Sequence, residues 1–204
     1  MRTIPAPVRD NRGNRQGRHP VVHSIELLLE DEAEAAIKRQ WRLLADAGLP
    51  SEHRPAPGTG SRRPHVTVVA CEQIPMATAT GLGPTLAEAL PLPVTIGVPM
   101  IFGTAKVGRP GLILVRQVLA NVRLLELQQR LKEGCPQALD GHFDEGRWAP
   151  HVTLARRLRP DQIPVALQLL ARTGASNGAP REMQVNLTGA RFWQGDLKQA
   201  RNLL

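Results

Sequence analysis

Polar and apolar residues alternate along the stretch 21–29, where Ser24 and Glu26 share one parity and apolar residues take the other. A period of two predicts a strand. Directly afterwards the apolar residues recur at spacings of four and three, at Ile37, Trp41 and Leu44. This spacing is typical of a helix that buries one face.

The ends of this helix carry their own signals. Asp31 is a candidate N-cap, with Glu34 three residues later in the position of a capping box. At the other end, Gly48 suits the left-handed position after a helix, and Pro50 blocks its continuation. We therefore expect a helix from about Asp31 to Gly48, followed by a loop over 50–64.

The rest of the chain continues the same alternation of elements. Runs of apolar and β-branched residues predict strands at 65–71, 93–102, 112–118, 151–155 and 182–193. Helical spacing predicts helices at 77–90, 121–133 and 161–171, the second with Leu124, Leu127 and Leu131 inward. The order strand–helix–strand–helix–strand thus occurs twice.

Short identical stretches show the same duplication. Pro-His-Val-Thr at 64–67 returns at 150–153, an offset of 86, and Glu-Gln-Ile-Pro at 72–75 is echoed by Asp-Gln-Ile-Pro at 161–164. Correlated matches of this kind indicate a repeated structural unit. We predict one α+β domain over residues 21–204, built of two repeats at about 21–100 and 101–204. A pseudo-twofold axis would relate two antiparallel sheets with helices on their outer faces.

Composition narrows the class of partner. Hydrophobic residues make up 42% of the chain, which excludes wholesale disorder, and 3% aromatics without Tyr argue against a base-stacking sheet. The net charge of +8 favours an anionic partner such as nucleic acid or a nucleotide. Codon bias is the alternative source of this charge, because 22 of the 26 basic residues are Arg. Residues 1–20 carry five Arg against one Asp and predict a disordered tail.

The cellular setting follows from what the chain does not contain. Cys71 and Cys135 lie 64 positions apart without a metal-binding spacing, so neither a disulfide framework nor a zinc knuckle is expected. No apolar run approaches the ~20 residues of a membrane span, and the first residues lack the apolar core of a secretory signal. We expect a cytoplasmic monomer without a membrane partner.

The repeated Pro-His-Val-Thr stretches carry the candidate chemistry. Alternate residues of a strand face the same side, so His65 and Thr67 share a face, as do His151 and Thr153. A pseudo-twofold axis would bring these faces together. One imidazole could then accept a proton while the other donates one, and the hydroxyls could bind phosphate oxygens. Chance predicts about a third of one His-x-Thr match in this composition, and two occur at equivalent places.

At these residues the chain resembles the 2H phosphoesterase superfamily, and within it the branch of 2′-5′ RNA ligases and RNA 2′,3′-cyclic phosphodiesterases. The resemblance covers residues 21 to about 200 and implies a bilobal fold with a metal-free active site in a central cleft. It implies His65 and His151 as the acid/base pair, with Thr67 and Thr153 as phosphate ligands. The expected substrate is an RNA terminus or cyclic nucleotide, with no cofactor.

Three further residues are weaker candidates. Arg156 stands where the second motif of that branch often has Arg, although strict alternation turns it away from His151. Glu26 and Arg116 interrupt apolar strands at roughly corresponding places and could line the cleft, or simply face solvent. The stretch 140–145 matches no metal-ligand spacing. After Thr67 the chain also departs from the branch, with Val-Val-Ala-Cys in place of Phe-Leu-Gly.

Two functions remain open from the sequence. The first is a metal-independent phosphodiesterase that hydrolyses 2′,3′-cyclic phosphates or 2′-5′ linkages. The second is a noncatalytic protein that binds a nucleotide or RNA end in the same cleft. Presence of both His and both Thr favours the enzyme.

Overall fold

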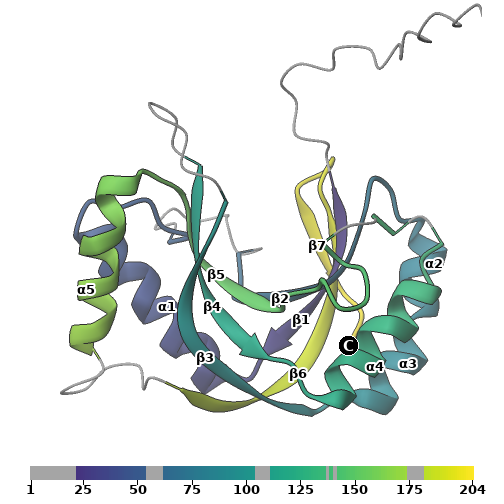
Figure 1. Ribbon diagram of the computed structural model, residues 1–204. Coiled ribbons are helices and arrows are strands. Elements are labelled where there is room, and N and C mark those ends of the chain that lie inside the picture. The colour runs from purple at the N-terminus through teal and green to yellow at the C-terminus, as the bar shows by residue number, and fades with distance from the viewer. Residues whose placement is uncertain (1–21, 54–61, 104–110, 137, 140–141, 174–181) are drawn as a thin grey trace, which may run out of the picture.

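The computed structural model describes residues 22–53, 62–103, 111–136, 138–139, 142–173 and 182–204 (Figure 1). The predicted tail, residues 1–20, lies outside the described residues. The strands are β1 His23–Leu29, β2 His65–Cys71, β3 Leu92–Phe102, β4 Leu112–Leu119, β5 His151–Leu158, β6 Met183–Gln194 and β7 Gln199–Asn202. The helices are α1 Asp31–Asp46, α2 Met76–Gly81, α3 Gly83–Ala89, α4 Val122–Glu133 and α5 Ile163–Thr173, the last preceded by the 3₁₀ turn η1 Pro160–Gln162.

The strands form one antiparallel sheet in the order β1-β2-β5-β4-β3-β6-β7, with a further pairing of β1 to β6. The sequence predicts two sheets, and hydrogen bonds join them. One joint is β6, whose residues 183–187 pair with β3 while residues 187–193 pair with β1. The other joint is a single pair, Val66 with Val152, between β2 and β5. The α+β fold class is therefore confirmed, with its two halves continuous.

The two repeats exchange strands. Strand β3 of the first repeat pairs with β4 and β6 of the second, and β6 of the second repeat pairs with β1 of the first. The pairings β1–β6 and β3–β4 correspond to each other under the predicted pseudo-twofold axis. Both pairings that cross the axis, β2–β5 and β3–β6, join equivalent strands of the two repeats.

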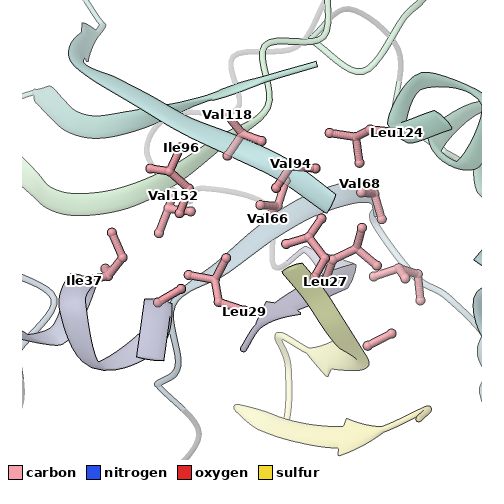
Figure 2. Close-up of a cluster of buried hydrophobic side chains, with 14 of the residues drawn as sticks. Leu27, Leu29, Ile37, Val66, Val68, Val94, Ile96, Val118, Leu124 and Val152 are labelled. Carbon is pink, nitrogen blue, oxygen red and sulfur yellow. The ribbon is translucent and has the colours of Figure 1, made fainter. Parts of the chain in front are cut away.

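Helices cover the outer sides of this sheet. Figure 1 shows α1 and α5 side by side on one flank and α2, α3 and α4 together on the other. The inward faces predicted for α1 and α4 are confirmed, since the residues named for them are buried: Ile37, Trp41, Leu44, Leu124, Leu127 and Leu131. These side chains join one hydrophobic cluster with the core-facing valines of the sheet (Figure 2). Full burial of a Leu or Ile contributes about 1.5–3 kcal/mol, so this cluster anchors both motif strands.

Helix ends agree only in part with the predicted signals. Gly48 has φ +71, the left-handed conformation expected after α1. The predicted cap at Asp31 is wrong, because the cap position is Glu30 and its side chain makes no capping bond. The single helix predicted at 77–90 is divided into α2 and α3. Pro84 has no N–H and lies in the first turn of α3, so it begins a new helix there.

Candidate active site

The two Pro-His-Val-Thr motifs meet where β2 and β5 cross the pseudo-twofold axis. Val66 and Val152 are the paired residues, and both are fully buried in the core. Because the strands are antiparallel, His65 lies opposite Thr153 on one side of this pair, and Thr67 lies opposite His151 on the other. By alternation all four side chains take the face away from the core. The structure thus brings the two predicted His-Thr pairs together at one place in the sheet.

Both imidazole rings are held in the same way. Nδ1 of His65 lies 2.7 Å from the carbonyl oxygen of Arg63, and Nδ1 of His151 lies 2.8 Å from that of Ala149. A carbonyl oxygen only accepts, so each Nδ1 carries the hydrogen and donates it. In both rings Nε2 is therefore the nitrogen that remains for proton transfer. The Arg191 nitrogen 3.3 Å from Nδ1 of His65 faces another donor, so this contact is not a hydrogen bond.

His151 lies in surroundings that favour the neutral ring. Burial lowers its pKa below the ordinary value, and the positive charges of Arg156 and His65 lower it further, against the opposing effect of the Ala149 carbonyl. The ring of Phe102 contacts it edge-on, with centroids 4.9 Å apart. A neutral imidazole with a free Nε2 can accept a proton.

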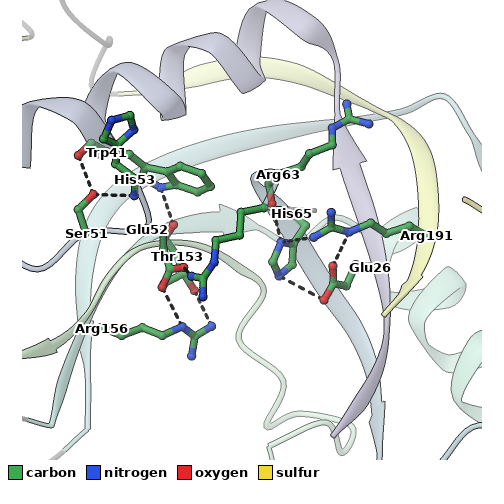
Figure 3. Close-up of polar contacts among 11 residues, drawn as sticks. Glu26, Trp41, Ser51, Glu52, His53, Arg63, His65, Thr153, Arg156 and Arg191 are labelled. Carbon is green, nitrogen blue, oxygen red and sulfur yellow. Dashed lines mark hydrogen bonds and ion pairs between the residues drawn. The ribbon is translucent and has the colours of Figure 1, made fainter. Parts of the chain in front are cut away.

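His65 lies beside a buried carboxylate. Oε1 of Glu26 is 3.5 Å from Nε2 of His65 and accepts a hydrogen bond of 2.8 Å from the Ser24 hydroxyl. Arg191 donates from Nε to the other carboxylate oxygen at 2.7 Å. The side chains of Glu26 and Arg191 are only 5% and 4% exposed, so this ion pair lies inside the wall of the site (Figure 3). His65 therefore contacts both members of a buried ion pair, Glu26 at Nε2 and Arg191 at Nδ1.

Two tryptophans fix the backbone of the motif threonines. The Trp41 indole N–H donates to the carbonyl of Thr153 at 2.9 Å, and that of Trp148 donates to the carbonyl of Thr67 at 3.3 Å. Because β2 and β5 pair at a single position, these carbonyls lie where the strand ladder ends. The indoles supply donors there, as buried carbonyls require.

A pocket of about 200 Å³ opens on one side of the motif crossing. Its lining residues are Glu26, Trp41, Glu52, Arg62, Arg63, Pro64, His65, Thr153, Arg156, Arg191 and Trp193. It thus contains His65 and Thr153, while Thr67 and His151 lie on the other side of the valine pair. Sequence reasoning missed Glu52, Arg63, Arg191 and both tryptophans as site residues. Of these residues only Arg63 could have been predicted from the sequence, because Arg62 and Arg63 directly precede the first motif.

Arg156 faces the site, contrary to strict alternation. A terminal nitrogen of its guanidinium lies 3.4 Å from Oγ1 of Thr153, and its Nε donates to Glu52 at 3.1 Å. The reason is a β-bulge: neighbouring Leu114 and Val115 of β4 pair with Ala155 and Thr153 of β5, so one extra residue enters β5. The extra residue shifts the phase of alternation and turns Arg156 toward Thr153.

The two remaining candidates separate. Glu26 lines the pocket, as its place in β1 indicates. Arg116 is buried and pairs with core-facing Val152, outside the pocket lining, and burial lowers its pKa. Within the described residues, no three His, Cys, Asp or Glu side chains are grouped to hold a metal ion. None of the described helices is both long and apolar enough to cross a membrane.

Comparison with known proteins places the chain in a family. The model of the 2′-5′ RNA ligase superfamily matches residues 29–198. The chain belongs to this superfamily. The resemblance indicated by the paired motifs is therefore confirmed, and the superfamily is one of phosphoesterase- and ligase-like enzymes. The comparison with curated proteins gave no match.

Several solved structures are similar to the chain over most of its length. Usb1 of Kluyveromyces marxianus is 13% identical with a TM-score of 0.47, covering 90% of this chain and 98% of that chain. The same protein with uridine monophosphate gives 12% and 0.45, again covering 90% and 98%. Escherichia coli LigT complexed with 3′-AMP is 14% identical with a TM-score of 0.44, covering 90% and 94%.

Proposed function

We propose that this superfamily member is a metal-independent phosphodiesterase that hydrolyses 2′,3′-cyclic phosphates or 2′-5′ linkages with two histidines. The observation that carries the proposal is that both imidazole rings make the same hydrogen bond to the backbone. Each Nδ1 donates to a backbone carbonyl two residues earlier, which leaves each Nε2 for proton transfer. Two imidazoles fixed in one tautomer at a pseudo-twofold axis suit a reaction that needs one base and one acid.

The surroundings of the two rings assign their roles. His151 is the general base, because its lowered pKa keeps it neutral and able to take a proton from the attacking water. His65 is the general acid, because the reaction needs one acid and His151 takes the other role. As the water oxygen bonds to phosphorus, the bond from phosphorus to the ribose oxygen breaks. His65 donates its proton to that ribose oxygen.

The phosphate itself would be held by neighbouring donors. The hydroxyls of Thr67 and Thr153 flank the two rings, and Arg156 lies within 3.4 Å of the Thr153 hydroxyl. Hydroxyl and guanidinium donors aimed at non-bridging oxygens stabilise the charge that they carry in the transition state. These side chains supply the contacts that a metal ion provides in other phosphodiesterases.

Hydrolysis of 2′,3′-cyclic CMP by purified protein tests the proposal directly. His65→Ala and His151→Ala should each lower kcat/KM by roughly 10²–10⁴, because each removes one proton transfer. The double variant should lose far less than the product of the single losses, since the two residues act as a unit.

Two outcomes would contradict the assignment. Full activity of either single variant would exclude the two-histidine mechanism. Loss of activity in excess EDTA, with recovery on adding a divalent ion, would exclude metal independence. A protein that only binds nucleotides would show saturable binding of the cyclic nucleotide and no product.

A further inference from the structure

Besides the buried pair of Glu26 and Arg191, the charged residues that line the pocket beside His65 are one carboxylate and three arginines. Oε1 of Glu52 accepts from Nε of Arg156 at 3.1 Å, and Oε2 accepts from a terminal nitrogen of Arg62. Arg63 lines the same pocket and pairs with Glu34 of α1, which is not a lining residue. The Glu52 side chain is 14% exposed, whereas those of Arg62 and Arg156 are 46% and 55% exposed. A sunken carboxylate thus holds two guanidinium groups that reach the open pocket.

The loop that carries Glu52 is fixed to the motif strand. The backbone N–H of Glu52 donates to the carbonyl of Leu154 at 3.1 Å, within β5. On either side, the Ser51 hydroxyl donates to the carbonyl of Trp41, and the N–H of His53 donates to the Ser51 hydroxyl (Figure 3). Arg62 and Arg156, which both bind Glu52, are therefore held in place relative to Thr153 before any ligand binds. This lowers the entropic cost of binding.

The charge of the pocket points to an anion. Glu26 and Arg191 neutralise each other in the buried wall. The remaining charged lining residues are three arginines and Glu52, and Arg63 also pairs with Glu34 outside the lining. Three arginines therefore face two carboxylates, which leaves an excess of one positive charge. Each guanidinium has five N–H donors in a planar fork that matches phosphate oxygens, and a bond to Glu52 uses only part of them.

The pocket extends away from the reacting centre. If the reacting phosphate lies at the Val66–Val152 crossing, as the proposed function requires, the arginines lie to one side of it, beyond His65 and Thr153. On the opposite side, next to His151, the ring of Phe102 is the contact instead. The two sides of the site therefore differ: the arginines lie on the side of His65, together with Trp41 and Trp193, and Phe102 contacts the ring of His151.

We infer that Arg62 and Arg63 bind a second phosphate of the substrate, adjacent to the one on which the histidines and Arg156 act. This inference rests on the proposed function for the position of the first phosphate. A free 2′,3′-cyclic mononucleotide has no such group. A phosphate on the 5′ oxygen of the terminal nucleoside occurs both in 5′-phosphorylated nucleotides and at RNA ends. The subsite therefore selects substrates that carry this group.

Binding of non-reacting product analogues tests the subsite without depending on turnover. Calorimetric titration should show cytidine 3′,5′-bisphosphate binding about tenfold more tightly than cytidine 3′-monophosphate, the effect of one charge-assisted contact set. In the double variant Arg62→Gln/Arg63→Gln this ratio should fall toward one. Arg130→Gln is the matched control, because Arg130 pairs with Glu88 in an exposed ion pair outside this pocket and should leave the ratio unchanged.

The source of the second phosphate is decided by a third ligand, the dinucleotide CpCp with a 3′-terminal phosphate. If it gains the same tenfold over the monophosphate, a phosphodiester suffices and RNA ends fit the subsite. If only the bisphosphate gains, the subsite requires a terminal phosphate, as in small nucleotides.

Equal binding of the monophosphate and bisphosphate by the wild-type protein, or no binding of the bisphosphate, would overturn the inference. So would an equal loss for both ligands in the double variant, because the arginines would then serve the first phosphate. Turnover of 2′,3′-cyclic CMP, measured in parallel, separates the two proposals. A bisphosphate preference without turnover would contradict the proposed function alone, and turnover without the preference would contradict the subsite alone.

Discussion

His65 and His151 show how identical side chains acquire different properties at the scale of single residues. Both rings are fixed by the same bond from Nδ1 to a backbone carbonyl. Their neighbours differ: His151 is half-buried against Phe102 with the charge of Arg156 nearby, whereas His65 lies beside the ion pair of Glu26 and Arg191. Burial disfavours the charged form of the His151 ring and lowers its pKa. This difference in surroundings is the basis on which we propose separate roles for the two rings.

The lowered pKa of His151 gives a prediction for pH. NMR titration of its ring should show a midpoint below the ordinary value of about 6.5. Because the unfolded ring binds its proton at higher pH than the folded ring, acidification below about pH 6.5 should favour unfolding, and this effect is absent above it. The acid limb of kcat/KM should fall at the same low pH as the titration.

Arg156→Gln provides the check on the cause of this shift. Removing the arginine charge should move the His151 midpoint upward, although burial remains the larger cause. A wild-type midpoint at or above 6.5 would contradict the assignment of His151 as the neutral base.

The buried pair of Glu26 and Arg191 should respond strongly to the loss of one partner. Arg191→Met leaves the carboxylate buried without its ion-pair partner and should lower the free energy of unfolding by about 3–5 kcal/mol. The double variant Glu26→Gln/Arg191→Met should lose much less than the sum of the single losses. Urea unfolding of all four proteins measures this coupling. Removing the exposed Arg130–Glu88 pair should change stability by only about 0–1 kcal/mol, and additive losses at Glu26 and Arg191 would contradict the prediction.

At the scale of the element, the motif strands depart from regular alternation in matching places. In β5 the register shifts after Thr153, and in β2 it shifts after Thr67, where Ile25 and Glu26 pair with Val69 and Thr67. Each bulge adds one residue and changes which side chains face the site. Arg156 faces Thr153 for this reason.

These bulges mark the limit of what the sequence predicts. Periodicity was sufficient for most strands and helices and for the burial of Val66 and Val152, since those patterns are local. No glycine signals either bulge, so the orientation of Arg156 could not follow from alternation. Glu52 and Arg191 reach the site only through tertiary contacts, with Arg156 and Glu26 respectively, across more than a hundred residues. A single sequence contains no local sign of such pairs.

The indole bonds at the motif threonines give a prediction about these strands. Trp41→Phe removes the N–H that the buried Thr153 carbonyl accepts, and should lower the free energy of unfolding by about 1–3 kcal/mol. Trp148→Phe is the matched control, since its bond to the Thr67 carbonyl is longer and only partly buried, and its cost should be smaller. Denaturant midpoints with unchanged slopes measure both. An equal cost for the two variants would contradict a special role for the buried bond.

At the scale of the whole molecule, the duplication is interlocked. Each repeat gives its last long strand, β3 or β6, to the sheet of the other repeat, and a common hydrophobic cluster joins both halves. The candidate site lies where this exchange closes, between β2 and β5. The arrangement explains why the predicted repeats share one sheet and do not form two.

A chain divided between Gly103 and Gly111 should therefore behave as two halves of one protein. Neither fragment keeps both neighbours of its own strands, so each should remain largely unfolded when purified alone. Mixing them should restore a folded complex, as judged by circular dichroism and by recovery of cyclic-phosphate hydrolysis. Independent folding of either fragment would contradict this expectation.

The same interlocking constrains how such a protein can change over generations. Deletion or replacement of one repeat removes a strand from the sheet of the repeat that remains. Core residues of the two repeats therefore have to change together. Side chains at the site can change independently, because they lie on the face of β2 and β5 away from the shared core. One copy can thus have arginines beside its histidine while the other has an aromatic ring. The two ends of the site then differ, although the two strands that carry it correspond.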